Sequence, residues 1–176
     1  MSLKMEEIDQ LNNIKITGSD CNELIVDYNA SMLDEMLRLF YNTVHSVNAK
    51  DYNTDQLNKW APEAIDKKKW EERLSNNVCL VTFHKDKIVG FGELSEEGRI
   101  DTMFVHKNFQ GKKIASRILE ELTGYAFDHD LRTLTTEASI TAKPFFERHG
   151  FKVVKVQKNH YNKTVFINYK MKKNIE

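Results

Sequence analysis

RIDTMFVHKNFQGKKIASRIL, residues 99–119, is the stretch that decides the fold of this chain. It predicts a strand that runs into a short turn and then directly into a helix. The turn holds the small and basic residues Gln110–Ala115. The first N–H groups of a helix have no partner within the helix, and the helix dipole is positive at that end. This junction is therefore a candidate anion site, and we expect a ligand that carries phosphate.

Composition and charge limit the classes of protein to which the chain can belong. With 176 residues it has the length of one ordinary domain. Its 30% charged and 40% hydrophobic residues are typical of soluble globular proteins. Lys plus Arg and Asp plus Glu both number 26, so the formal net charge is zero. We therefore expect no nucleic acid and no anionic membrane as a partner.

The cysteines and histidines give no sign of a disulfide framework or a metal site. Cys21 and Cys79 are too few and too scattered for either, and the six histidines lack metal-ligand spacing. No apolar run is long enough to span a membrane, and no signal peptide opens the sequence. We expect a cytoplasmic, metal-free protein with residues 1–20 as an N-terminal extension, opened by a candidate tag remnant, and residues 21–176 as a single domain.

The hydrophobic pattern changes between helix and strand periods along the chain. Ser31 is predicted to cap a helix, and Pro62 and Pro144 are predicted to stand in the first turns of two others. Gly150 is predicted to end the last helix in the left-handed conformation. The predicted helices are residues 31–44, 54–60, 62–74, 111–125 and 141–149, and the predicted strands are residues 24–28, 78–83, 88–94, 100–105, 131–137, 151–156 and 165–171.

This order of elements predicts an α/β (α+β) fold. We expect a mixed, mostly antiparallel central sheet of about seven strands flanked by helices. The strand Val165–Met171 alternates well between apolar and polar residues and is expected at an exposed edge of the sheet. A second copy of the chain can pair with such an edge, so a homodimer is a candidate assembly.

Two motifs resemble those of the GNAT superfamily of N-acetyltransferases. The acetyl-CoA signature of that family is Gln or Arg, two residues, Gly, one residue, then Gly or Ala at a strand-to-helix junction. This chain matches it with Gln110 and Ala115 and departs from it at Lys113, where the inner glycine would stand. The second motif, SITAKPFFERHGF at residues 139–151, has an Ala, an aromatic pair, a charged residue and Gly-Phe. The element order fits the family from about residue 24 to residue 171.

The resemblance implies a site for acetyl-CoA between two splayed strands, residues 100–105 and 131–137. Amides near Phe104 and Val105 would bind the pantetheine arm and stabilise charge on the thioester oxygen. Lys113 adds charge and bulk where the family has glycine. Its bulk can clash with the cofactor, or its ammonium can help to hold a phosphate. We expect it to weaken CoA binding without abolishing it. The pyrophosphate would lie on the backbone of Gln110, Gly111, Lys112, Lys113, Ile114 and Ala115, with further contacts from Ser116 and Arg117. Ser139, at a position that is often Asn in the family, is a further candidate cofactor-binding residue.

The acceptor implied by the family is a primary amine on a small molecule or a peptide. It must lose a proton before it attacks, so a general base is expected nearby. Asp101 and Glu93 are the carboxylates on the central strands, and the sequence does not rank them. Many family members carry a Tyr acid where this chain has Phe146. Other candidate acids are Tyr161, Tyr169, Ser139 and His160, and the residues expected beside the acceptor are His45 and Tyr52.

Two functions from different classes follow from these residues. The first is an N-acetyltransferase that moves acetyl from acetyl-CoA to a primary amine by direct attack in a ternary complex. The alternative is a non-catalytic CoA-binding or regulatory domain of the same fold, which Phe146 and Lys113 favour. A different acyl donor is a third reading, to be decided by pocket size.

Each candidate residue also has a purely structural interpretation. Residues 110–115 can be an ordinary helix start, and Asp101 can be an ion-pair partner. The Gly90-Phe91-Gly92 segment lies in a strand and lacks the third glycine of a dinucleotide fingerprint. Aromatic residues at helical or buried positions are usually core, and an apolar strand predicts an inert thiol at Cys79. The aromatic residues concerned are Phe145, Phe146, Trp60 and Trp70.

Overall fold

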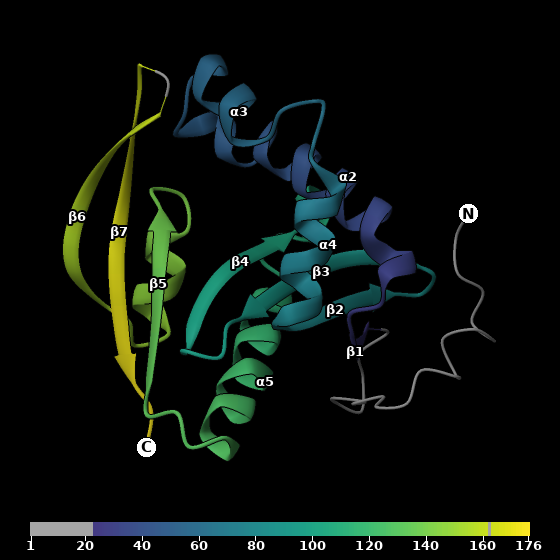
Figure 1. The fold of residues 1–176 in the computed structure, drawn as a ribbon, viewed down its shortest axis with the longest axis vertical. Coiled ribbons are helices and arrows are strands. Elements are labelled where there is room, and N and C mark those ends of the chain that lie inside the picture. The colour runs from purple at the N-terminus through teal and green to yellow at the C-terminus, as the bar shows by residue number, and fades with distance from the viewer. Residues whose placement is uncertain (1–22, 162) are drawn as a thin grey trace.

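The computed structural model describes residues 23–161 and 163–176. The predicted N-terminal extension, residues 1–20, and Cys21 lie outside them. One sheet of seven strands runs through the described chain in the order β1-β2-β3-β4-β5-β7-β6 (Figure 1). Among the described strands, only β4 and β5 pair in parallel, which confirms the mixed, mostly antiparallel sheet. The strands are β1 (Glu23–Asp27), β2 (Val78–His84), β3 (Lys87–Leu94), β4 (Arg99–Val105), β5 (Thr133–Ser139), β6 (Lys152–Tyr161) and β7 (Thr164–Asn174).

Helices cover both faces of the sheet. In Figure 1, α2 and α4 cross one face of β2 and β3, and α5 packs on the other. None of the helices in the described ranges is long and apolar enough to cross a membrane. The helices are α2 (Leu33–Val44), α3 (Thr54–Trp60), α4 (Lys67–Asn76), α5 (Ile114–Asp128) and α6 (Lys143–Arg148), with short 3-10 turns η1 (Ala30–Met32), η2 (Asn48–Lys50) and η3 (Lys107–Phe109).

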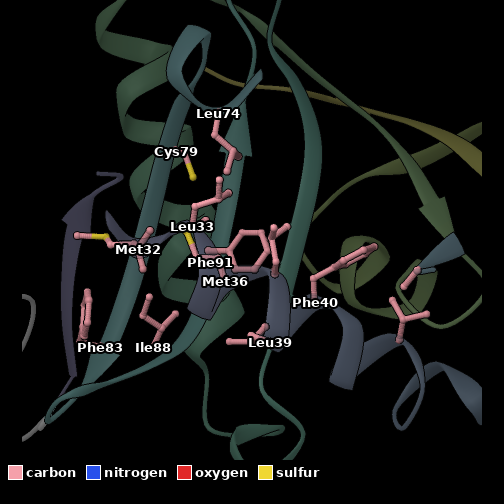
Figure 2. Close-up of a cluster of buried hydrophobic side chains, with 14 of the residues drawn as sticks. Met32, Leu33, Met36, Leu39, Phe40, Leu74, Cys79, Phe83, Ile88 and Phe91 are labelled. Carbon is pink, nitrogen blue, oxygen red and sulfur yellow. The ribbon is translucent and has the colours of Figure 1, made fainter. Parts of the chain in front are cut away.

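Strand β3 separates the two hydrophobic cores. Phe91 is fully buried against α2 and α4, beside Met36 and Leu74 (Figure 2). Cys79 lies in the same cluster, and burial raises the pKa of its thiol, as expected for an inert residue. Leu94 points to the opposite face and joins the cluster built on α5.

Two glycines in β3 bring α5 close to the sheet. A Cβ at Gly90 would lie 2.8 Å from Ile114 Cγ2, and one at Gly92 would lie 2.6 Å from Ile118 Cγ2. Both distances are shorter than van der Waals contact, so only glycine fits under the helix at its present height. The Gly90-Phe91-Gly92 segment is therefore a packing feature that sets the position of α5.

The structure corrects three predicted helix starts. Ser31 is not the cap of α2, because a 3-10 turn precedes that helix and the Asn29 side chain accepts the Ser31 N–H at 3.0 Å. Pro62 lies in a loop, and α4 begins later, at Lys67, with Asp66 as its cap. Helix α5 begins at Ile114 and not at residue 111. These starts follow side-chain caps and backbone turns, which apolar periodicity does not report.

The prediction for the last helix is confirmed, whereas the prediction for the sheet edge is wrong. Pro144 stands in the first turn of α6, and Gly150 follows that helix with a φ of 86°, both as predicted. The expected edge strand is wrong, because β7 pairs with β5 on one side and β6 on the other. The edges of the described sheet are β1 and β6. Any pairing between copies through this end of the sheet would therefore use β6.

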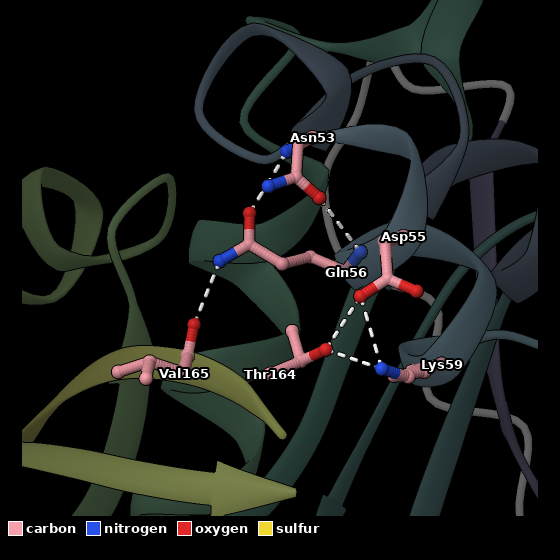
Figure 3. Close-up of polar contacts among 6 residues, drawn as sticks. All are labelled: Asn53, Asp55, Gln56, Lys59, Thr164 and Val165. Carbon is pink, nitrogen blue, oxygen red and sulfur yellow. Dashed lines mark hydrogen bonds and ion pairs between the residues drawn. The ribbon is translucent and has the colours of Figure 1, made fainter. Parts of the chain in front are cut away.

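Polar contacts fasten α3 to the start of β7 (Figure 3). Asn53 and Gln56 form a capping box, and the Gln56 Nε2 donates to the Val165 carbonyl at 2.8 Å. The Lys59 ammonium donates to the Thr164 hydroxyl, which donates to Asp55. Segments about a hundred positions apart in sequence thereby meet and close one end of the molecule.

The close approach of α5 predicts the effect of two glycine substitutions. Gly92→Ala should lower the free energy of unfolding by about 1–3 kcal/mol, because the new methyl group overlaps Ile118. Gly124→Ala is the matched control, since nothing lies within 4 Å of a Cβ at this exposed helical position. It should stabilise the protein by up to about 1 kcal/mol. Urea unfolding measures both, and equal effects would contradict the packing argument.

Candidate active site

A cleft opens where β4 and β5 separate. The two strands pair only at Arg99 with Thr135 and at Ile100 with Thr136, and they diverge beyond these residues. Figure 1 shows β4 curving away from the upright β5 and β7. The cleft has a volume of about 1120 Å³. Its walls come from β4, β5, the start of α5, α6, and the aromatic side chains of α2, α3 and α4.

The start of α5 presents unpaired amides at this cleft. Arg117 N–H is the first amide of the helix to reach a carbonyl, that of Lys113. Within the described chain, no protein group accepts from the amides of residues 111–116. Gly111 and all residues from Lys113 to Ser116 line the cleft. The arrangement has the charge and the donors that a bound phosphate needs.

Lys113 adopts the backbone conformation that glycine favours. Its φ of 62° and ψ of 10° lie in the left-handed region, and Gly111 has a φ of 73°. Lys113 therefore keeps the path of a glycine turn at a cost of about 1–2 kcal/mol. The Gln110 side chain also holds the turn, since its Nε2 donates to the Val105 carbonyl at 2.5 Å.

The structure places most of the predicted cofactor residues on the cleft. Lys112 is an exception, because its ammonium lies 4.6 Å from the centroid of the Phe109 ring. Arg117 is also absent from the lining and pairs with Glu23 at 2.8 Å. The predicted residues that line the cleft are Phe104, Val105, Gln110, Gly111, Lys113, Ile114, Ala115, Ser116 and Ser139.

The strand register directs the two amides predicted on β4 to opposite sides of the strand. His106 N–H donates to Val89 on β3 at 2.8 Å, and Phe104 pairs with Phe91 on the same strand. Main-chain groups alternate in direction along an antiparallel strand. The Phe104 amide thus faces β3, and the Val105 amide faces the open side. The Val105 carbonyl agrees with this direction, because it accepts from Gln110 and from Thr43.

A serine–histidine contact joins α5 to α6 on the cleft wall. The His149 Nδ1 lies 2.9 Å from the Phe145 carbonyl, which can only accept, so Nδ1 carries a hydrogen. In the neutral ring, Nε2 then accepts the Ser116 hydroxyl at 3.0 Å. Ser139 acts nearby, since its hydroxyl accepts the Ala142 N–H at the approach to α6. His149 is part of the second motif, but nothing in the sequence pattern marks it as a site residue.

The two candidate bases lie in different surroundings. Asp101 lines the cleft and forms a two-point ion pair with Arg99, with both N–O distances at 2.8 Å. Glu93 is fully buried and outside the lining. Both of its carboxylate oxygens are engaged, by the Asn77 amide at 2.6 Å and by the Thr102 hydroxyl at 2.6 Å. Arg73 completes the set with its Nε 3.2 Å from the Glu93 Oε1.

The candidate acids are also separated by the structure. Tyr161 lines the cleft near the exposed end of β6, whereas His160 and Tyr169 do not line it. Phe146 is buried in the core of the α5 face and carries no proton to give. No group of three or more His, Cys, Asp or Glu side chains gathers to hold a metal within the described ranges.

The residues predicted beside the acceptor have two different positions. Tyr52 lines the cleft, its hydroxyl accepts the Ile140 N–H at 2.9 Å, and burial raises its pKa. It is therefore protonated at neutral pH. His45 lies outside the cleft lining, and its ring nitrogens contact the Tyr41 carbonyl and the Asn58 side chain.

Comparison with known proteins agrees with this geometry. The family model of the acetyltransferase (GNAT) domain matches residues 48–173. The chain belongs to the GNAT acetyltransferase family. It is 32% identical over 151 residues to the uncharacterized N-acetyltransferase YafP of Escherichia coli K12, which covers 86% of this chain and 95% of that protein.

Solved GNAT structures have the same fold. A GCN5-related N-acetyltransferase from Rhodopseudomonas palustris superposes with a TM-score of 0.82 at 25% identity, covering 86% of this chain and 94% of that one. The PaiA N-acetyltransferase of Thermoplasma acidophilum, solved in complex with coenzyme A, gives 0.73 at 16% identity, covering 87% and 99%. The resemblance of the sequence motifs to the GNAT family is thus confirmed.

The surroundings of the two carboxylates predict different effects on stability. Glu93→Gln should lower the free energy of unfolding by about 1–3 kcal/mol. It disturbs the hydrogen bonds of a buried carboxylate and leaves Arg73 without its counter-charge. Asp101→Asn should change it by less than about 1 kcal/mol, since Arg99 is half exposed. Urea unfolding of the two variants compares them, and a larger loss for Asp101→Asn would contradict the assignment.

Proposed function

We propose that this GNAT protein transfers acetyl from acetyl-CoA to a primary amine by direct attack in a ternary complex. The observation that supports it is the row of unpaired amides at residues 111–116, which lies at the mouth of a cleft between two diverging strands. That cleft is large enough for the arm of CoA and a small acceptor together.

The residues of the cleft fit the chemical groups of CoA. The amides of residues 111–116 would bind the diphosphate, and the Lys113 and Arg148 side chains bring positive charge to the same lining. The Ser116–His149 contact would hold the wall between the diphosphate and α6. Acetyl-CoA supplies an acyl thioester with a good leaving group. The Val105 amide, directed to the open side of β4, would donate to the carbonyl oxygen as charge develops on it.

Asp101 is the base that we propose. It lines the cleft, whereas Glu93 is buried and both of its carboxylate oxygens accept hydrogen bonds from protein side chains. An amine enters largely as ammonium at neutral pH, and a carboxylate can take its proton directly or through one water. Tyr161 is the candidate that would return a proton to the thiolate, because it lines the cleft and carries a hydroxyl.

The alternative function is a CoA-binding domain without turnover. Phe146 favours it, because this position is buried in the core and provides no acid.

The proposal also keeps the cytoplasm as the location. Metal-free chemistry and a homodimer remain predictions from the sequence.

Lys113 gives a direct test of the diphosphate site. Lys113→Gly should relieve backbone strain and stabilise the protein by about 1 kcal/mol. Contrary to the expectation from the sequence, Lys113→Gly should also weaken CoA binding about 3- to 10-fold at low salt, and less at high salt, because Lys113 already follows the backbone path of a glycine and one cation leaves the anion site. Lys112→Gly is the matched control, since Lys112 is not part of the cleft lining and its ammonium lies over the Phe109 ring. Calorimetry at two salt concentrations measures both, and equal losses of affinity would contradict the placement.

Asp101 separates the enzyme from the binding domain. Asp101→Asn should lower kcat/KM for an amine about 100-fold or more, because the amide cannot take the proton, while CoA affinity stays within about 2-fold. The assay is release of free CoA across a panel of amines. Unchanged turnover would reject Asp101 as the base. Tight CoA binding with no turnover on any amine in the wild-type protein would favour the alternative.

A further inference from the structure

The acceptor end of the cleft is built from aromatic rings. They belong to the hydrophobic cluster on the α2 and α4 face, whereas the start of α5 belongs to the cluster on the opposite face. The two ligands of the proposed reaction would therefore enter from opposite faces of the sheet. Several rings touch one another, as Phe40 does with Phe104 and Trp70, both at 4.9 Å between centroids. The aromatic residues that line this end are Phe40, Tyr52, Trp60, Trp70, Phe104 and Phe166.

A second cavity adjoins this end, and one arginine borders both. The smaller cavity has a volume of about 330 Å³ and shares Phe40, Trp60, Trp70 and Arg73 with the main cleft. Arg73 thus stands at the boundary between the two spaces. An acceptor held in the cleft has room to extend past it, and its apolar part would meet the aromatic walls.

The guanidinium of Arg73 is held in place from two sides. Its Cζ lies 4.3 Å from the centroid of the Trp70 ring, and its Nε lies 3.2 Å from the Glu93 carboxylate. Glu93 is itself immobilised by Asn77 and Thr102. We infer that Glu93 is a positioning residue, which explains why a carboxylate is buried beneath a cleft that it does not line.

Arg73 still has donors to give. Its Nε and Nη2 are both buried, and no group in the described chain accepts a hydrogen bond from either, although the Nε lies 3.2 Å from the Glu93 Oε1 in an ion pair. A buried donor without a partner costs free energy, so native structures rarely keep one without a reason. A guanidinium whose donors are not all used by one carboxylate can also bind a second oxyanion, and Arg73 lines both cavities.

We propose that the acceptor is an amine that also carries a carboxylate and an aromatic or bulky apolar group, and that Arg73 binds the carboxylate. This inference rests on the proposed acetyl transfer. The other charges that line the cleft are Lys50, Lys59, Asp101, Glu137, Lys113 and Arg148, while Asp66 and Lys69 border the smaller cavity. Asp101 and Glu137 would attract the ammonium group. They would repel a phosphate dianion more strongly than a carboxylate, which favours the singly charged group.

The test compares matched acceptors that differ in the carboxylate alone. We expect the wild-type protein to acetylate phenylalanine and tryptophan with a kcat/KM at least about 10-fold above that of phenethylamine and tryptamine. Arg73→Gln should lower kcat/KM for the two amino acids about 10- to 100-fold, mainly through KM, and change that for the two amines less than about 3-fold. Equal or better use of phenethylamine and tryptamine by the wild-type protein would overturn the inference while leaving acetyl transfer intact.

A binding experiment separates this inference from the proposed function. Quenching of Trp60 and Trp70 fluorescence should show N-acetylphenylalanine binding at least about 10-fold more tightly than N-acetylphenethylamine, without any turnover. If Arg73→Gln fails to fold, Arg73→Lys replaces it, because lysine keeps a positive charge opposite Glu93. The Arg73→Lys protein should still lose most of its preference for N-acetylphenylalanine, since lysine lacks the planar guanidinium. Equal binding of the two ligands would overturn the inference, as would tighter binding of the phosphonate analogue of N-acetylphenylalanine. Absence of turnover on every amine would count against acetyl transfer alone.

Discussion

The brief parallel pairing of β4 with β5 is the constraint on which the rest of the structure depends. Two residue pairs hold the strands together, and the separation beyond them opens the cleft through the sheet. Helix α5 follows β4 and packs down on Gly90 and Gly92, so that its first amides lie beside the opening. The same local geometry thereby produces both features on which the proposed function depends, the row of unpaired amides and the cleft.

In the proposed function, the two faces of the sheet bind different ligands. On the α5 face, backbone donors and the Ser116–His149 contact form a polar wall suited to a phosphorylated ligand. On the α2 and α4 face, aromatic rings and Arg73 form a wall suited to an apolar molecule with one anionic group. Asp101 lies on the strand between them, where an amine from one side would meet a thioester from the other.

Much of the fold was predictable from sequence, because it depends on local signals. Residues 54–60 were predicted as a helix with the observed bounds, and the turn at residues 110–115 lies where the motif placed it. The order of β7 and β6 was not predictable from alternation, since an interior strand and an edge strand can carry the same pattern. The predicted start of α4 at Pro62 is wrong, because proline occurs in loops as well as in first helical turns, and Asp66 caps the observed helix.

The site was less predictable than the fold, because its key contacts join residues distant in sequence. Arg73 lies in KKKWEER, a charged helical stretch whose sequence is typical of solvent-exposed surface. Only the tertiary structure shows that Glu93 lies beneath it and that Trp70 supports it. Asp101 and Glu93 are alike in sequence terms, yet burial places one in the cleft and the other in the core.

The most direct test of the central claim is an NMR titration of the ¹⁵N-labelled protein with CoA, with pantetheine as the ligand that lacks the diphosphate. The amide resonances of residues 111–116 should shift downfield on addition of CoA and stay nearly unchanged with pantetheine, which should perturb Val105. Saturable CoA binding that leaves the amides of residues 111–116 unmoved would contradict the account, and so would shifts of equal size with pantetheine.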